Sequence, residues 1–439
     1  MTPTSEQDPS RIPVLMDLVS ALTRASRSQQ ALDIYVDGLK KAYHPYAVCS
    51  LDVRGLGSGA YRIERLTNAA GEDVTPGRPT GQKSAPVQHG GALGDLIATP
   101  GPRIVRGLHV DGDSVVGTLL SGVRSAMLAP RMDEGSICGW SVVFSDQEGA
   151  FSDRGLEDLV IRSSLLGAVL ANVQVAEQLQ QANRWIEGEI DRIAKIQLAM
   201  LPQPMPQIPR LSIAAGYQTY DRAGGDYYDM LPIDPEPGRS QPDPNDPWCI
   251  VIADASGHGP AGAVVVAMLH AILHSYPGRT ASPSEVLFHV NSHLYAKRVE
   301  ASFVTAVLGF FHPRDLTFTY ARAGHCPPIL KGAMPDEPLV RLNAVGGLPL
   351  CVDQDFRYEE ATIQLRPGQT LVLYTDGIAD AVNPAGQHFG ESGIEHALSQ
   401  CGGEPKCVVQ SVHNALRVHE AGQRPTDDQT LVALQVQPL

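Results

Sequence analysis

Hydrophobic and polar positions in the first third of the chain follow helical spacing first and strand-like spacing afterwards. Apolar residues three and four positions apart predict helices over Ile12–Thr23 and Gln29–Ala42. Strand-like apolar runs follow at Tyr46–Val53, Tyr61–Leu66, Arg103–Val110, Ser125–Ala129 and Ile137–Ser145. Helical spacing returns after Ser152, a residue suited to a helix N-cap. This order predicts a mixed α/β domain over residues 11–165, preceded by a disordered lead at residues 1–10.

A long helical pattern without a break runs from Leu165 to Met200. Its apolar positions form two stripes of three-four spacing, which join with a one-residue slip between Ala176 and Leu179. A narrow stripe is typical of a coiled coil between two protomers, and a slip alters the supercoil locally. We therefore predict a coiled-coil linker at residues 166–201 and a homodimer; the alternative is a helix packed on its own domain. Prolines then end the helix at Pro202, Pro204, Pro206 and Pro209.

The rest of the chain alternates strands and helices. Apolar runs predict strands at Ile250–Ala253, Phe303–Phe311, Leu316–Ala323, Leu371–Tyr374 and Thr430–Val436. Helical spacing predicts helices at Ala261–His274, Glu285–Lys297 and Glu404–Glu420. Ser282 and Glu285 fit a capping box, and the second and third strands fit a β-hairpin. The stretch Asp234–Pro247 holds too many prolines for regular structure and is expected to be a solvated loop.

Composition narrows the class of protein. The 439 residues are 43% hydrophobic and 19% charged, which is typical of a folded globular chain with two or three domains. The net charge of −14 argues against nucleic acid and anionic membranes as partners. No apolar stretch of about 18 residues predicts a membrane span, and the polar N-terminus does not resemble a signal peptide. Seven scattered cysteines without a C-x-x-C pair indicate reduced thiols and a cytoplasmic location.

Four aspartates, Asp226, Asp254, Asp376 and Asp427, occupy turn-like positions beside apolar runs. Neighbouring glycines or aspartates allow the backbone to come close at each of them. Carboxylates delivered from several strand ends to one point are the ligands that Mg²⁺ and Mn²⁺ prefer. Two such ions about 3.5–4 Å apart clamp a phosphoryl group and ionise the attacking water. The pattern therefore indicates a two-metal hydrolase.

The aspartates belong to a longer series of motifs. In chain order these are Ile196–Pro202, Gly224–Asp229, Asp254–Gly262, Tyr320–Pro328, Gly346–Leu350, Leu371–Gly377 and Asp427–Thr430. Together they resemble the stage II sporulation protein E-type branch of the metal-dependent serine/threonine protein phosphatases. The resemblance implies an αββα-sandwich domain over residues 202–439. It also implies hydrolysis of phosphoserine or phosphothreonine, with two Mn²⁺ or Mg²⁺ ions, on a phosphorylated anti-sigma-factor antagonist.

The same resemblance implies individual roles. Asp226, Asp376 and Asp427 are expected metal ligands, and Asp254 is expected to bridge both ions. Ala255 is expected to contribute its backbone carbonyl oxygen to one ion, so its side chain does not matter. These five residues are the predicted catalytic and metal-binding set.

Neighbouring residues leave alternatives open. Asp428 competes with Asp427 for the last ligand position, because adjacent acids cannot be ranked from sequence. Asp229 is expected to be a supporting or structural acid, and His258 to position the loop or cap a helix rather than act as a general acid. Cys326 stands where the family usually has asparagine and is expected to be an unreactive thiol. His325 is expected to be a hydrogen-bonded core residue rather than a metal ligand.

Other functions account for less of the sequence. The stretch Arg222–Asp226 is similar to a diguanylate cyclase signature, but Tyr227 follows where those enzymes have glutamate, and the other aspartate motifs stay unexplained. A catalytically inactive scaffold that binds a partner through the phosphatase fold is the second alternative. Residues 11–165 resemble a GAF-type sensor domain, which implies a small-molecule or protein effector. A nonspecific α+β dimerisation module is the alternative there.

Overall fold

The computed structural model describes residues 11–68, 70–76, 85–233, 243, 245–257, 259–276, 282–297, 302–334 and 337–438. The chain divides into two compact units, Met1–Arg184 and Trp185–Leu439. The expected lead at residues 1–10, most of Asp234–Pro247 and His258 lie outside the described residues.

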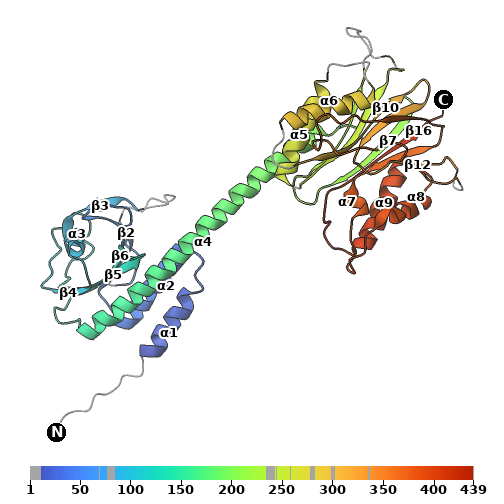
Figure 1. Ribbon diagram of the computed structural model, residues 1–439. Helices are drawn as coiled ribbons and strands as arrows, with labels where there is room; N and C mark the ends of the chain where they lie inside the picture. The colour runs from blue at the N-terminus through green and yellow to red at the C-terminus, as the bar shows by residue number, and fades with distance from the viewer. Residues whose placement is uncertain are drawn as a thin grey trace. The chain divides into compact units, whose positions relative to one another are not determined.

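The first unit is built on a six-stranded antiparallel sheet of order β3-β2-β1-β6-β5-β4 (Figure 1). Its elements are α1 (Arg11–Leu22), α2 (Ser28–Tyr43), β1 (Ala47–Asp52), β2 (Ala60–Thr67), β3 (Val87–His89), α3 (Gly91–Ala98), β4 (Arg103–Arg106), β5 (Ser125–Asp133), β6 (Ser136–Ser145) and the first part of α4 (Asp153–Met200). The predicted helices and five predicted strands are confirmed. The short strand β3 and the glycine-containing helix α3 were not predicted, because neither carries a clear apolar period.

Both faces of this sheet are buried, and successive side chains along a strand pack on opposite faces. On β6, Val143 packs with α1, α2 and α4, whereas Val142 and Phe144 pack with α3 and the loops of the other face. This alternation follows from the two-residue period of a strand. It explains why the strand reads as a continuous apolar run in the sequence.

Helix α4 is continuous over 48 residues, so the helix predicted after Ser152 and the predicted linker are one element. The Ser152 hydroxyl accepts a 3.3 Å hydrogen bond from Gly155 N, as expected near a helix start. Residues 178–188 of α4 are exposed, and they include the apolar side chains of Leu179, Trp185 and Ile186.

Within the described ranges, α4 is the one helix long and apolar enough to cross a membrane by length and composition alone. No membrane-spanning segment was predicted from the sequence. In the N-terminal part of α4, Leu159, Leu166 and Leu170 are buried against the sheet of the first unit. The core helix of a globular domain can be equally long and apolar, so length and composition are only weak evidence for a membrane span.

The second unit contains two five-stranded antiparallel sheets, of order β14-β11-β10-β9-β8 and β13-β12-β15-β16-β7. The first sheet comprises β8 (Asp226–Pro232), β9 (Trp248–Ala255), β10 (Val304–His312), β11 (Thr317–Ala323) and β14 (Glu360–Gln364). The second comprises β7 (Leu211–Gln218), β12 (Ile329–Lys331), β13 (Val340–Arg341), β15 (Thr370–Tyr374) and β16 (Gln429–Val436). The helices are α5 (Pro260–His274), α6 (Pro283–Ala296), α7 (Asp376–Ala379), α8 (Gly390–Ser399) and α9 (Pro405–Glu420).

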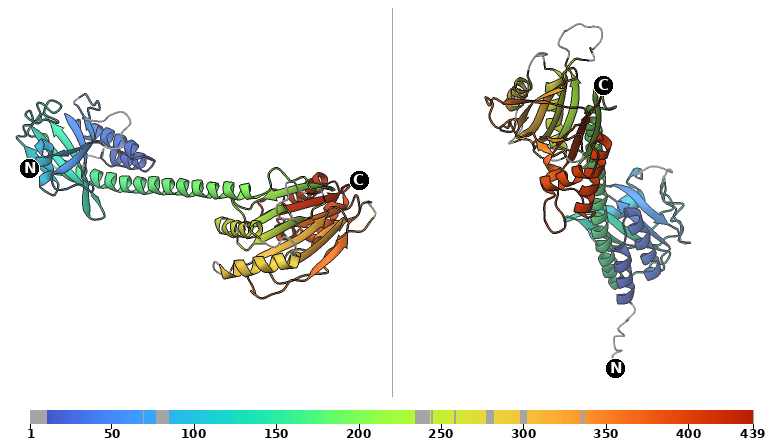
Figure 2. Two further views of the ribbon diagram at one scale, coloured as in Figure 1. Left: turned by 90° about the horizontal axis from the view of Figure 1, so that it is seen from above. Right: turned by 90° about the vertical axis from the view of Figure 1, so that its right-hand side faces the viewer.

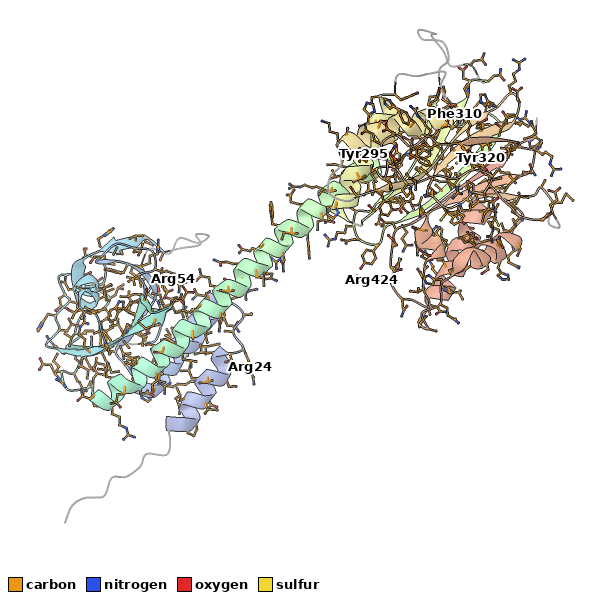
Figure 3. The ribbon with its side chains drawn as sticks, viewed as in Figure 1. Arg24, Arg54, Tyr295, Phe310, Tyr320 and Arg424 are labelled. Atoms are coloured by element: carbon orange, nitrogen blue, oxygen red, sulfur yellow. The ribbon has the colours of Figure 1, made fainter. Side chains whose placement is uncertain are left out.

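The two sheets pack face to face, with helices on both outer sides (Figures 1 and 2). On β15, Leu371 and Leu373 enter the core shared with the first sheet, whereas Val372 and Tyr374 pack against α8 and α9. Helices α5 and α6 cover the first sheet. The shared core includes Phe310, which is labelled in Figure 3. The layers are therefore helix, sheet, sheet and helix.

Several predicted details of this unit are confirmed. The β10–β11 hairpin forms, and Ser282 and Glu285 make a reciprocal capping box at α6. Strands β7, β8 and β12–β14 and helices α7 and α8 were not predicted. Strand β8 matters most, because Asp226 is its first residue and the two glycines before it had indicated only a turn.

Candidate metal centre

Strand pairing brings the first two predicted aspartates together. Asp226 on β8 lies directly opposite Asp254 on β9 in the antiparallel ladder. Gly225 precedes Asp226 and accepts a 2.9 Å hydrogen bond from Ala255 N. A Cβ atom added to Gly225 would lie 2.9 Å from Gly257 O and still nearer to the carbonyl oxygen of Ala255. The close approach of these two backbone segments therefore requires glycine at position 225.

Two threonines of the second sheet hold the Asp226 carboxylate. The hydroxyls of Thr375 and Thr430 donate hydrogen bonds of 2.8 and 2.6 Å to Asp226 Oδ2. Asp226 is 1% exposed, so these bonds replace the water that the carboxylate loses on burial. Neither threonine was predicted as a site residue from the sequence, although each lies within three residues of a predicted acid.

The other two aspartates come from the second sheet. Asp376 is the first residue of α7, directly after β15, and Asp427 lies just before β16. Burial, followed by the charges of Asp376, Asp427 and Asp428, raises the pKa of Asp254 to about 7. Each of these three acids must therefore lie close enough to Asp254 to repel it. The fold brings all four predicted aspartates into one centre.

The acids disfavour one another's ionised forms. Burial raises the pKa of Asp226 well above its ordinary value, and the charge of Asp254 raises it further. Burial and the charge of Asp427 also raise the pKa of Asp376. A cluster of carboxylates that resist ionisation in the absence of a cation is the environment in which a divalent ion is strongly favoured. The donor set consists of oxygen atoms, which fits Mg²⁺ or Mn²⁺.

Asp427 and Asp428 differ in their surroundings. Asp428 is 2% exposed; its Oδ1 accepts a 2.7 Å hydrogen bond from Tyr220 N and its Oδ2 a 2.6 Å bond from Gly225 N. Asp427 is exposed, and its Oδ1 accepts a 2.8 Å hydrogen bond from Asp428 N. Asp428 therefore holds the backbone around Gly225, whereas Asp427 is the more accessible of the two acids.

The C-terminal end of α4 contacts the same loop. The buried side chain of Gln197 donates a 2.7 Å hydrogen bond to Gly224 O and accepts a 3.0 Å bond from Gly224 N. One side-chain amide therefore pairs with both backbone polar groups of Gly224, two positions before Asp226. Gln197 lies in the first of the motifs recognised in the sequence, but its role could not be assigned there.

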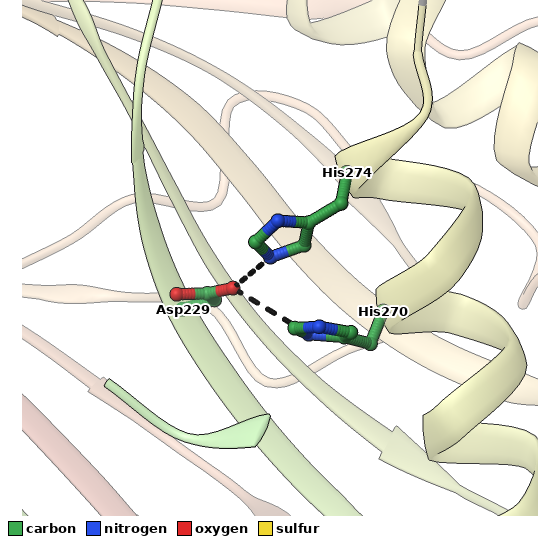
Figure 4. Close-up of side chains that lie close together, drawn as sticks. All are labelled: Asp229, His270 and His274. Carbon is green, nitrogen blue, oxygen red and sulfur yellow. Dashed lines mark hydrogen bonds and ion pairs between the residues drawn. The ribbon is translucent and has the colours of Figure 1, made fainter. Parts of the chain in front are cut away.

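Three further residues singled out in the sequence are not among the four acids. Asp229 faces α5, where it accepts a hydrogen bond from His274 (Figure 4). It also accepts one from Tyr227 on its own strand. His325 is buried with its Nδ1 2.7 Å from the Thr305 hydroxyl, and burial lowers its pKa to about 3, in agreement with an uncharged core residue. Burial, followed by the charge of Asp376, raises the pKa of Cys326 to about 12, so its thiol is unreactive as predicted.

The chain is similar to one family model, to two curated proteins and to a solved structure. Residues 244–437 match the family model described as Stage II sporulation protein E, a range that contains Asp254, Asp376 and Asp427 but begins after Asp226. Phosphoserine phosphatase RsbU of Bacillus subtilis (strain 168) is 29% identical over 229 residues, which is 51% of this chain and 64% of that protein. Phosphoserine phosphatase RsbP of the same organism is 22% identical over 205 residues, which is 46% of this chain and 47% of that protein.

Among solved structures, the SiaA-PP2C domain of Pseudomonas aeruginosa matches with a TM-score of 0.49 and 21% sequence identity. The match covers 58% of this chain and 98% of that domain. The chain thus spans less than two thirds of the length of the two curated relatives.

Proposed function

We propose, from the premise that residues 244–437 form a phosphatase domain of the Stage II sporulation protein E type, that this chain is a metal-dependent protein-serine/threonine phosphatase. The observation that carries the proposal is the convergence of Asp226, Asp254, Asp376 and Asp427 from both sheets of the sandwich. Two relatives named as phosphoserine phosphatases support the same activity.

The four carboxylates and the backbone carbonyl of Ala255 would hold two divalent ions, Mn²⁺ or Mg²⁺. When bound, such ions would supply Lewis-acid polarisation of the phosphoryl oxygens and a more acidic water as the nucleophile. The protein supplies a fixed ligand geometry: Thr375 and Thr430 orient Asp226 through two hydrogen bonds. No cysteine nucleophile is part of this proposal.

The substrate is inferred to be a phosphoserine or phosphothreonine in a protein of the anti-sigma-factor antagonist type. The inference rests on the family resemblance of the motifs and on the phosphoserine phosphatases RsbU and RsbP. We place the protein in the cytoplasm, consistent with seven cysteines that are all free thiols.

Phosphate release from a phosphoserine protein tests the activity directly. We expect release by the full chain with Mn²⁺ or Mg²⁺ and none with EDTA. Release that persists in EDTA would exclude two-metal hydrolysis. Metal binding without release from any phosphoprotein tried would favour the inactive scaffold over the enzyme.

The adjacent acids Asp427 and Asp428 offer a matched pair of variants. Asp427→Asn is expected to lower activity at least about 100-fold with an unchanged melting temperature, because it removes a ligand from an exposed position. Asp428→Asn replaces a carboxylate that accepts two backbone N–H groups and should lower the unfolding free energy by about 1–3 kcal/mol. Activity assays of both variants with Mn²⁺, and thermal melts of both variants without metal, measure the contrast. The reverse pattern would make Asp428 the ligand.

The first unit is proposed to be a GAF-type sensor, with α4 as a coiled coil in a homodimer. The exposed apolar side chains of Leu179, Trp185 and Ile186, at 61%, 68% and 49% exposure, support a partner helix on this stretch. An effector that changes the packing of α4 would act on the metal centre through Gln197, which holds Gly224. Such coupling requires that the effector bind two states of the protein unequally.

Sedimentation of the full chain tests the dimer. Leu179→Glu with Ile186→Glu is expected to convert a dimer to a monomer, because charges replace apolar side chains in the helix interface. Gln181→Glu, at an exposed position outside the stripe, is the matched control and should sediment as the wild type does. A wild-type monomer, or a double variant that remains dimeric, would contradict the coiled coil.

A further inference from the structure

A second group of metal-ligating side chains lies on the opposite face of β8 from Asp226. Asp229, His270 and His274 each offer one ligand atom, and these atoms lie within 4.8 Å of one another (Figure 4). His274 Nε2 is 2.8 Å and His270 Nδ1 is 3.8 Å from Asp229 Oδ2. None of the three belongs to the four-aspartate centre.

The fold builds this group from one helix and one edge strand. His270 and His274 are one turn apart on α5, with ring centroids 4.0 Å apart, so both point to the same side of the helix. Asp226 and Asp229 are three residues apart on β8 and therefore face opposite sides of the sheet. Asp226 meets the second sheet, whereas Asp229 meets α5.

The group is closed on the protein side and open on the solvent side. The Asp229 side chain is 7% exposed, whereas those of His270 and His274 are 28% and 42% exposed. Tyr227 donates a 2.7 Å hydrogen bond to Asp229 Oδ2, and Met230 N donates a 2.7 Å bond to Oδ1. These bonds fix the carboxylate in the way that hydrogen-bonded neighbours orient metal ligands. The two imidazoles are accessible to solvent water on that side.

The chemistry of the group differs from that of the aspartate centre. Two imidazoles with one carboxylate form a set that suits Zn²⁺ and similar transition-metal ions, whereas Mg²⁺ prefers oxygen ligands. Tetrahedral ligands at Zn²⁺ bond lengths are about 3.3 Å apart. The observed separations of 2.8 and 3.8 Å from Asp229 Oδ2 lie on either side of that spacing.

We propose that Asp229, His270 and His274 bind one Zn²⁺-class ion, with water completing the coordination, and that this ion ties α5 to the edge strand β8. The bound ion would join β8, the strand that begins with Asp226, to α5, the helix that follows the Asp254 loop. Its expected consequence is a more stable second unit, because a metal that binds only the folded chain shifts the unfolding equilibrium.

The chain offers a matched control for the test. His289 and His293 on α6 are also one turn apart, with ring centroids 3.9 Å apart at 36°, against 4.0 Å and 37° for His270 and His274. Within the described part of the chain, His289 and His293 belong to no such three-ligand group. The first pair faces the buried Asp229 carboxylate, and its His270 Nδ1 also lies 2.9 Å from the Tyr227 hydroxyl. In the second pair, His293 Nδ1 lies 2.9 Å from the backbone oxygen of His289.

The test is Co²⁺ and Zn²⁺ binding to the full chain, with excess Mg²⁺ present to fill the aspartate centre. We expect the wild type to bind one Zn²⁺. With Co²⁺ it should give an intense visible absorption, which is typical of a four- or five-coordinate site with nitrogen ligands. His274→Gln should weaken binding at least about tenfold and abolish the absorption, and His293→Gln should change neither. Glutamine can still donate to Asp229, so this variant should remain folded without metal.

Equal binding by the wild type and His274→Gln would overturn the proposal, and so would equal losses in His274→Gln and His293→Gln. Zn²⁺ should also raise the melting temperature of the wild type and of His293→Gln, but not that of His274→Gln. These measurements do not depend on phosphatase activity, so they test the metal site separately from the proposed function.

Discussion

Asp254→Asn is expected to reduce metal-dependent phosphate release at least about 10³-fold, because the proposed bridging carboxylate is lost and with it several kcal/mol of metal-based transition-state stabilisation. The measurement is phosphate release from a phosphoserine protein at saturating Mn²⁺. Asp315→Asn, at an exposed position in the β10–β11 turn, is the control and should keep wild-type activity. An Asp254→Asn variant within tenfold of the wild type would remove Asp254 from the proposed ligand set.

Stability distinguishes this loss from misfolding. Burial, followed by the charge of Asp376, raises the pKa of Asp254 to about 7, above the value near 3.9 expected in the unfolded chain. The folded state therefore holds this proton more tightly, and the stability that it contributes below about pH 4 is lost as the pH rises through 7. Asparagine cannot ionise, so the metal-free variant should melt at or above the wild-type temperature at pH 8.

Gly225→Ala is expected to have the second largest effect. Its Cβ would meet two backbone oxygens, those of Ala255 and Gly257, which cannot turn away as a side chain can. Gly225 also exchanges hydrogen bonds with its neighbours, accepting from Ala255 N and donating to Asp428 Oδ2. We expect a loss of about 1–3 kcal/mol in unfolding free energy, with metal affinity and activity falling together because Asp226 and the Ala255 carbonyl move apart.

Thermal melts and Mn²⁺ titrations of the full chain measure both effects. Gly188→Ala is the matched control: it lies on an exposed part of α4, and an added Cβ would meet no atom within 4 Å. Alanine there should stabilise the helix by about 0.5–1 kcal/mol without changing metal affinity. A Gly225→Ala variant with wild-type metal affinity would show that this close approach does not support the centre.

Local patterns in the sequence determined the elements with a clear period. The strand β15 and the helix α9 were predicted from their apolar spacing, and the Ser282 capping box from two residues three positions apart. Each of these patterns lies within a few neighbouring residues, so it can be recognised without knowledge of the tertiary structure. The four aspartates were recognised in the same way, from short motifs in a fixed order.

Strand β8 was not predicted, because its local sequence pattern does not indicate a strand. Its sequence DYYDMLP follows two glycines, and neither of its acids suggests a strand. Pairing with β9 and burial between α5 and the second sheet decide its conformation. The structure also separates the two acids, because Asp226 and Asp229 face opposite sides of the sheet.

The sequence by itself therefore determined the chemistry available to this protein: four acids in a known order, a long helix before them, and no thiol placed for catalysis. Only the tertiary structure decided how the acids are placed. It buried Asp428 against Gly225, brought Thr375 and Thr430 to Asp226, and placed His270 and His274 against Asp229. The physical reason is distance along the chain, because these partners are 41 to 204 positions apart and meet only when the sheets and helices pack.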